Sequence, residues 1–263
     1  IYFSSLCNRF DSNRHVFLCR SLFGFYCWYN SQEIKDYLEN SVPFYQNGMV
    51  ELIADEESSL ATPTKSAYPG NYISHSGGTG TIGFNAYYNG KWGVVTNGHI
   101  APSGKSMSCA DGTLGTPTFS YIGGKVDVAF IPYPSGWTPT SALKQPNAEI
   151  IYREATDSEM IEGGLVTKYG NTTGKTRNGR ILSTSVDVAC NYGGSIGVKT
   201  IKDCFSYTNA TEKGDSGGPV GRGKVREVFR LLGINFAKGS DCGFGIKLSN
   251  IKSAYPMTVK TGY

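Results

Sequence analysis

Length, composition and charge narrow the classes to which this chain can belong. Its 263 residues suffice for one large domain or for two lobes that share an interface. Charged residues make up only 17% and there are 34 glycines, which favours short strands joined by glycine turns over long salt-bridged helices. The net charge of +4 identifies no partner, and no apolar run reaches the roughly 18 residues that span a bilayer. We therefore expect an all-β protein.

Residues 1–65 differ in pattern from the remainder of the chain. The stretch 16–28 is apolar and aromatic and resembles the core of a signal peptide. A short capped helix is predicted over residues 31–38, and Asn47-Gly48 is a hairpin signal. The acidic, proline-containing stretch 55–70 has the composition of a linker. We expect these elements to form a short α/β N-terminal leader that is removed by proteolysis, as a pro-segment is, to leave a new N-terminus between Ser58 and Tyr72.

The body of the chain has the pattern of a β protein. From Ile73 onward, short apolar runs alternate with glycine, asparagine and serine. Asn89-Gly90 predicts a tight hairpin within residues 81–96. The proline-containing stretch 133–147 indicates a crossing between two halves, and helical periodicity is nearly absent except for a turn near the C-terminus. Further strands are predicted at 126–133, 165–169, 179–190, 196–207 and 225–236.

The strongest chemical signal is the hexapeptide Gly-Asp-Ser-Gly-Gly-Pro at residues 214–219. A serine between glycines suits a nucleophile, because small neighbours let a substrate approach and let backbone N–H groups point inward. In such an arrangement Ser216 is the nucleophile, and the amides of Gly214 and Ser216 form an oxyanion hole. The alternative interpretation is an ordinary glycine-rich turn.

A serine hydroxyl is a weak nucleophile until a base accepts its proton. His99 follows an apolar strand and a glycine turn, whereas His75 lies among serines and glycines without comparable support. Asp127 is embedded in the apolar run 126–131, where a carboxylate is costly unless it is hydrogen-bonded or paired. A histidine N–H satisfies it and fixes the imidazole tautomer. The alternatives are a structural histidine and an edge-strand aspartate that faces water.

The order of these residues excludes one competing fold. Residues 214–218 also match the G-x-S-x-G pattern of α/β-hydrolases, whose histidine follows the serine. No histidine follows His99 in this chain. The order His99, Asp127, Ser216 is instead that of chymotrypsin.

These motifs resemble the trypsin/chymotrypsin-type serine proteases, and most closely their streptogrisin and α-lytic protease branch. Residues 81–99 are similar to the strand pair that leads to the catalytic histidine, and 166–174 to a K-x-G-x-T-T-G segment. Residues 233–242 resemble the substrate-binding strand with its cysteine loop. The resemblance implies two six-stranded antiparallel β-barrels with the site in the cleft between them. The implied boundaries are 1–65 for the leader, 66–140 for the first barrel and 141–263 for the second.

The cysteines bear on compartment and cross-linking. Cys109, Cys190, Cys204 and Cys242 are an even set that suits disulfides in an oxidising compartment, while three further cysteines near the start do not fit that picture. The resemblance suggests the pair Cys204–Cys242 and leaves Cys109–Cys190. No Cys/His spacing predicts a metal site. The family's cysteine beside the catalytic histidine is replaced by Ile100, and Asn97 stands where alanine is usual.

Specificity is inferred from the resemblance alone. Ala210 stands six places before the nucleophile, where trypsin-like enzymes carry an acidic residue that binds arginine or lysine. Phe236, Ala237 and Lys238 replace small residues of the pocket wall, so Phe236 is expected to narrow the pocket. We predict poor cleavage after arginine or lysine and a preference for medium apolar or acidic residues. The acidic preference requires Lys238 to point inward, and the alternative is that it reaches into solvent.

The sequence thus predicts a serine endopeptidase that acts through an acyl-enzyme intermediate. We expect a secreted zymogen that works as a monomer on polypeptide substrates, with no cofactor, metal, nucleic acid or membrane involved. The alternative is a catalytically silent protease fold kept as a binding module. A separate group of cations shares parity on one predicted strand and is either a solvated strand face or a contact for an acidic substrate or polyanion: Arg222, Lys224, Arg226 and Arg230.

Overall fold

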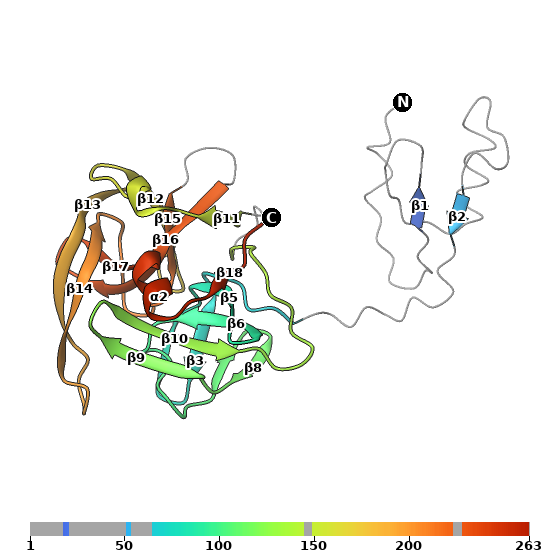
Figure 1. Cartoon of the computed structure of the whole chain (residues 1–263), viewed down its shortest axis with the longest axis horizontal. Coiled ribbons are helices and arrows are strands. Elements are labelled where there is room, and N and C mark those ends of the chain that lie inside the picture. Colours follow the sequence, from blue (N-terminus) through green and yellow to red (C-terminus); the bar gives the residue numbers. More distant parts are fainter. Residues whose placement is uncertain (1–17, 21–50, 54–64, 145–148, 223–227, 263) are drawn as a thin grey trace. The chain divides into compact units, whose positions relative to one another are not determined.

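The computed structural model describes residues 18–20, 51–53, 65–144, 149–222 and 228–262 (Figure 1). The chain divides into two units, Ile1–Pro63 and Thr64–Tyr263. In the first unit, β1 (Leu18–Arg20) and β2 (Glu51–Ile53) pair in antiparallel fashion. The helix predicted over 31–38 and the turn predicted at Asn47-Gly48 lie outside the described residues.

The first half of the second unit is built from two antiparallel sheets. One has the strand order β4-β3-β7-β8 and the other β18-β5-β6-β10-β9. Asn89 and Gly90 both have positive φ, 46° and 80°, as the predicted hairpin turn between β5 and β6 requires. The strands are β3 (Tyr72–His75), β4 (Gly78–Thr81), β5 (Phe84–Tyr88), β6 (Lys91–Thr96), β7 (Met107–Cys109), β8 (Gly112–Gly115), β9 (Phe119–Gly123) and β10 (Val126–Pro132).

The second half is a closed barrel. Its strands follow the order β16-β15-β12-β13-β14-β17, and β17 pairs back onto β16. β11 joins β16 in parallel, an exception to the antiparallel pattern that was expected. The elements are β11 (Ile150–Glu154), the 3₁₀-helix η1 (Asp157–Glu159), β12 (Leu165–Gly170), β13 (Gly174–Asn191), β14 (Val198–Tyr207), β15 (Pro219–Arg222), β16 (Val228–Lys238), β17 (Gly243–Lys247), α2 (Leu248–Ala254) and β18 (Thr258–Val259).

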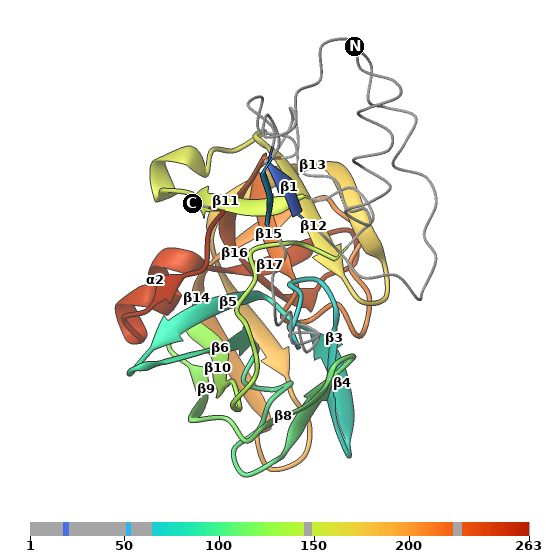
Figure 2. The same cartoon turned by 90° about the vertical axis from the view of Figure 1, so that its right-hand side faces the viewer.

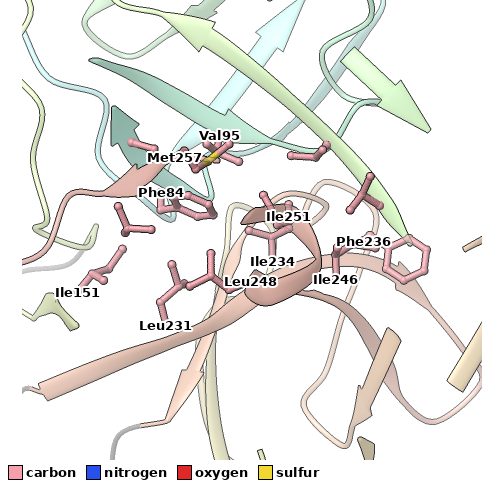
Figure 3. Close-up of a cluster of buried hydrophobic side chains, with 14 of the residues drawn as sticks. Phe84, Val95, Ile151, Leu231, Ile234, Phe236, Ile246, Leu248, Ile251 and Met257 are labelled. Carbon is pink, nitrogen blue, oxygen red and sulfur yellow. The ribbon is translucent and has the colours of Figure 1, made fainter. Parts of the chain in front are cut away.

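The two halves share one hydrophobic core. Phe84 and Val95 of the first half belong to the same buried cluster as Ile234 of β16 and Ile251 of α2 (Figure 3). Each such side chain contributes about 1.5–3 kcal/mol when it is fully buried. After α2, the chain returns to the first half, where β18 pairs with β5. The halves are therefore held together both by the shared core and by the C-terminal strand.

The long hairpin of β13 and β14 crosses from one half to the other. In both views its far end extends alongside the first-half strands (Figures 1 and 2). Lys202 of β14 donates its backbone N–H to Gly124 O, in the turn between β9 and β10, at 2.8 Å. This contact fixes the hairpin end beside the start of β10. No helix in the described ranges is long and apolar enough to cross a membrane.

The disulfide pairing that the resemblance suggests is wrong. The four body cysteines are all free in the structure. Cys109 is buried in a cluster of first-half residues, whereas Cys190 packs against the core that joins the halves. Cys204 is buried in β14, and Cys242 follows β16 in a turn. Cys109 thus lies in a different packing cluster from Cys190 and Cys204, which both belong to the core that joins the halves.

Candidate active site

His99 lies in a turn that immediately follows β6. The backbone N–H groups of Ile100 and Ala101 donate to Asn97 O, at 3.2 and 3.1 Å, which closes the turn. Gly98 precedes the histidine at a point of close approach, since a Cβ there would lie 2.6 Å from Tyr121 O. The glycine that marked this turn in the sequence is thus required because the backbone of β9 passes close to it.

Asp127 is the second residue of β10 and is fully buried. Its Oδ2 lies 2.5 Å from His99 Nδ1, and its Oδ1 accepts the His99 backbone N–H at 3.1 Å. Tyr192 donates its hydroxyl to Oδ2 at 3.0 Å. A buried carboxylate in this position keeps the imidazole proton on Nδ1, so Nε2 is left as the proton acceptor. The structure therefore brings two of the predicted site residues together.

Asn97 explains one departure from the resembled family. Its side chain is fully buried, and its Nδ2 donates to Asp127 O at 2.8 Å. The amide thus ties the His99 turn to β10, where the smaller alanine has no donor. A bond of this kind contributes about 1 kcal/mol to stability.

Ser216 lies in the turn between β14 and β15. The turn contains two glycines with positive φ, Gly214 at 101° and Gly217 at 92°. Thr81 of β4 anchors it twice, because its N–H donates to Ser216 O and its hydroxyl donates to Gly214 O, each at 2.7 Å. A Cβ at Gly217 would lie 2.1 Å from Thr96 Oγ1, at the end of β6. The Ser216 turn thus packs against the strand that leads into His99.

The Ser216 hydroxyl does not reach His99 in this structure. It donates to Phe236 O at 3.4 Å, and the hydrogen bonds of the described residues include none between Ser216 and His99. The bond to Phe236 is long, and rotation about χ1 redirects a serine hydroxyl at little cost. Catalytic hydrogen bonds are often long in unliganded enzymes. Within the described part of the chain, the backbone N–H groups of Gly214 and Ser216 donate to no acceptor.

Asp215 holds the Ser216 turn from the opposite side. Its carboxylate pairs with Lys168 Nζ at 2.6 Å, and both side chains are completely buried. It also accepts from the Thr173 hydroxyl and from the N–H groups of Thr172, Thr173 and Glu212, at 2.7 to 3.0 Å. Burial by itself raises the pKa of Asp215, but Lys168 and these donors outweigh it and hold that pKa below its usual value.

A hollow of about 290 Å³ lies beside the segment that donates to Asp215. It is lined by Gly70, Lys144 and residues 169–174, and it borders none of His99, Asp127 and Ser216. Because none of these three residues lines the hollow, we assign it no part in the chemistry of the Asp127–His99 pair.

The structure changes the expectation for the substrate pocket. Ala210 is exposed and brings no carboxylate to this position. Phe236, however, is only 3% exposed and packs into the core near Ile246 (Figure 3). Its ring is therefore not free to narrow an open pocket. Ala237 is half-buried, and Lys238 is half-exposed and pairs with Glu212 at 2.7 Å. This ion pair corresponds to the alternative in which Lys238 lies at the surface.

Two cations of the group on the predicted strand have internal partners. Arg230 donates to Glu159 Oε1 at 2.8 Å, and Arg222 donates to Glu159 O. Lys224 and Arg226 lie outside the described residues. Arg222 and Arg230 thus hold the 3₁₀-helix η1, which is a structural role on the strand face.

Two residues of this site had no role in the sequence-based expectations. Tyr192 follows β13 without any local motif, so nothing in the sequence indicated its contact with Asp127. Lys168 carried a weak signal, because it is a lysine in an otherwise apolar strand and begins the K-x-G segment. A charged lysine in such a strand needs a carboxylate partner if it is buried, and this signal could have suggested a buried aspartate.

Comparison with solved structures identifies the fold. Protease A of Thermobifida fusca superposes with a TM-score of 0.60 at 23% identity, covering 75% of this chain and 100% of that one. A Nocardiopsis protease gives 0.61 at 22%, and a Cellulomonas bogoriensis chymotrypsin 0.60 at 22%, each with the same coverage. The all-β, chymotrypsin-like fold predicted from the sequence is thereby confirmed. No family model and no curated protein matches the sequence.

Proposed function

We propose that this protein is a serine endopeptidase in which Ser216 is the nucleophile, His99 the general base and Asp127 the residue that orients His99. The observation that carries the proposal is the buried Asp127 carboxylate, bonded to His99 Nδ1 at 2.5 Å beside the anchored Ser216 turn. The likeness in fold to solved serine proteases supports it.

The proposed chemistry runs in two steps. His99 Nε2 takes the Ser216 proton while Oγ bonds to the substrate carbonyl carbon, and the Gly214 and Ser216 amides donate to the oxyanion. The C–N bond then breaks, the leaving nitrogen takes the proton from His99, and an ester remains on Ser216. Water repeats the sequence: His99 takes its proton, its oxygen attacks the ester carbon, and Ser216 Oγ leaves with that proton.

Labelling with a fluorophosphonate tests the proposal. The wild-type protein should be labelled on Ser216, and Ser216→Ala should not react. Asp127→Asn should slow the labelling on the order of 10³-fold or more, because the imidazole loses its correct tautomer. Asp111→Asn is the matched control, since Asp111 accepts a bond from the Ser66 N–H and does not contact His99. Folded wild-type protein that resists labelling would instead be the silent binding module.

We further propose that the enzyme cleaves after medium apolar residues rather than after arginine or lysine. Ala210 brings no carboxylate to the position that binds a cationic side chain, and Glu212 is already paired with Lys238. Lys238 is half-exposed, so solvent screens its charge and an acidic residue gains little from it. A peptide library decides between these outcomes. Dominant cleavage after arginine or lysine rejects the proposal, and so does an acidic preference that disappears in Lys238→Met.

A further inference from the structure

Asp127 receives its hydrogen bonds from both halves of the fold. His99, in the first half, supplies two donors, its ring Nδ1–H and its backbone N–H. Tyr192 supplies the third and comes from the far end of the β13–β14 hairpin, 65 residues further along the chain. The carboxylate is fully buried, so each donor replaces a water that it has lost. The site is therefore completed by an element of the second half.

The hairpin end has a defined shape that places Tyr192. The Tyr192 N–H donates to Gly197 O at 3.0 Å, and the Gly197 N–H donates to Gly193 O at 3.2 Å. Gly193, Gly194 and Gly197 all have positive φ, which bends the chain tightly here. The bond from Lys202 N to Gly124 O then fixes the hairpin to the turn that precedes β10. Tyr192 is thus held at Asp127 by the hydrogen bonds within its own turn and by the bond between Lys202 and Gly124.

The phenol of Tyr192 is suited to act as a permanent donor. Its burial and the nearby Asp127 carboxylate raise the pKa of Tyr192 far above its usual value, so the hydroxyl keeps its proton. Cys190 and Cys204 contribute to the raised pKa of Tyr192 in the same direction. The ring lies against the imidazole of His99, with 5.4 Å between the centroids and a tilt of 53°.

We propose that Tyr192 is a positioning residue for the Asp127–His99 pair. Its hydroxyl holds Asp127 Oδ2 in place. The carboxylate therefore keeps its orientation toward the imidazole and its distance from Nδ1, and the His99 proton stays on Nδ1. His99 Nε2 then faces the substrate side as an acceptor. The inference rests on the proposed serine-peptidase function, and it adds that the hairpin of the second half controls how well the base is aligned.

Tyr192→Phe tests the proposal because it removes the hydroxyl and keeps the ring. A hydrogen bond to a charged group predicts a fall in kcat of roughly 10- to 100-fold, with KM changed by no more than about twofold. In an Asp127→Asn background the same substitution should cost less than about threefold, since its target has been altered. Tyr133→Phe is the matched control, because that hydroxyl donates to Asn85 and not to Asp127. It should keep the wild-type kcat.

Three outcomes would overturn the proposal: a wild-type kcat in Tyr192→Phe, an equal loss in both backgrounds, or a raised KM at constant kcat. The last would make Tyr192 a substrate contact. A readout independent of activity is the ¹⁵N spectrum of the histidines. Tyr192→Phe should shift His99 away from a pure Nδ1–H tautomer, and Tyr133→Phe should not. Failure of fluorophosphonate labelling alongside this shift would reject the peptidase function and leave the positioning role standing, whereas unchanged His99 resonances reject the role itself.

Discussion

Asp215 shows how a single residue stabilises the turn that carries the proposed nucleophile. It is next to Ser216 in sequence, and its carboxylate is satisfied by Lys168, by Thr173 and by the N–H group of Glu212. A buried ion pair contributes little net stability by itself, but leaving one partner alone is costly because the remaining charge is still out of water. The pair therefore matters chiefly through what its disruption does to the turn.

Replacing Lys168 by methionine should expose this dependence. We expect Lys168→Met to lower the free energy of unfolding by about 3–5 kcal/mol, because Asp215 remains buried without its cation. Labelling of Ser216 should slow as the turn loses its anchor. Lys125→Met is the control, since Lys125 is 59% exposed and pairs with Asp203 at the surface, and it should cost less than about 1 kcal/mol. Similar losses in the two variants, measured by urea unfolding, would contradict the argument.

At the scale of elements, η1 holds two strands of the second half together. Glu159 accepts bonds from Arg153 of β11, from Arg230 of β16 and from the Thr156 N–H. The hydrogen bond from Arg153 is the main cause that lowers the pKa of Glu159 to about 2. η1 is therefore held to the barrel by a carboxylate that stays ionised well into acid.

The lowered pKa predicts a pH dependence of stability. A carboxyl group whose pKa is lower in the folded state contributes fully above its unfolded value of 4.5, and its contribution is lost as the pH falls toward 2. The urea midpoint of the wild-type protein should therefore fall more steeply between pH 4.5 and 2 than that of Glu159→Gln. Asp157→Asn, an exposed change in the same element, should retain the wild-type slope. Parallel curves for wild type and Glu159→Gln would refute this account.

At the scale of the whole molecule, the second unit begins its structure at Lys65. Lys65 forms a bridge with Trp137, and its carbonyl accepts the Thr138 N–H at 2.9 Å. Ser66 donates its N–H to Asp111 and its hydroxyl to Thr138 O, each at 2.9 Å. Cleavage after these residues would break contacts of the folded unit.

Removal of the leader should therefore occur before Lys65. The sequence alone predicted a new N-terminus between Ser58 and Tyr72, and these contacts narrow the expectation to the part from Ser58 to Lys65. Mass spectrometry of the purified active protein measures it directly. A mature form that begins after Ser66, or full-length protein with full activity, would count against the pro-segment. Secretion stays a prediction. Disulfides no longer support it, because the four body cysteines are free in the structure.

Local patterns in the sequence determined the β-rich class, the hairpin at Asn89-Gly90 and the residue types of the site. Such signals act over a few residues: a glycine pair sets a turn, and an aspartate in an apolar strand demands a donor. His99 was the one histidine with suitable flanking residues, and the structure does place it against Asp127.

Only the tertiary structure decided which distant residues complete these sites. Tyr192 meets Asp127 across 65 positions and Lys168 meets Asp215 across 47, and neither contact has a local signature. The burial of the Phe236 ring likewise depends on how the two halves pack. The physical reason is that sequence periodicity specifies which face of a strand is buried, whereas the partner on that face is set by the arrangement of the barrels.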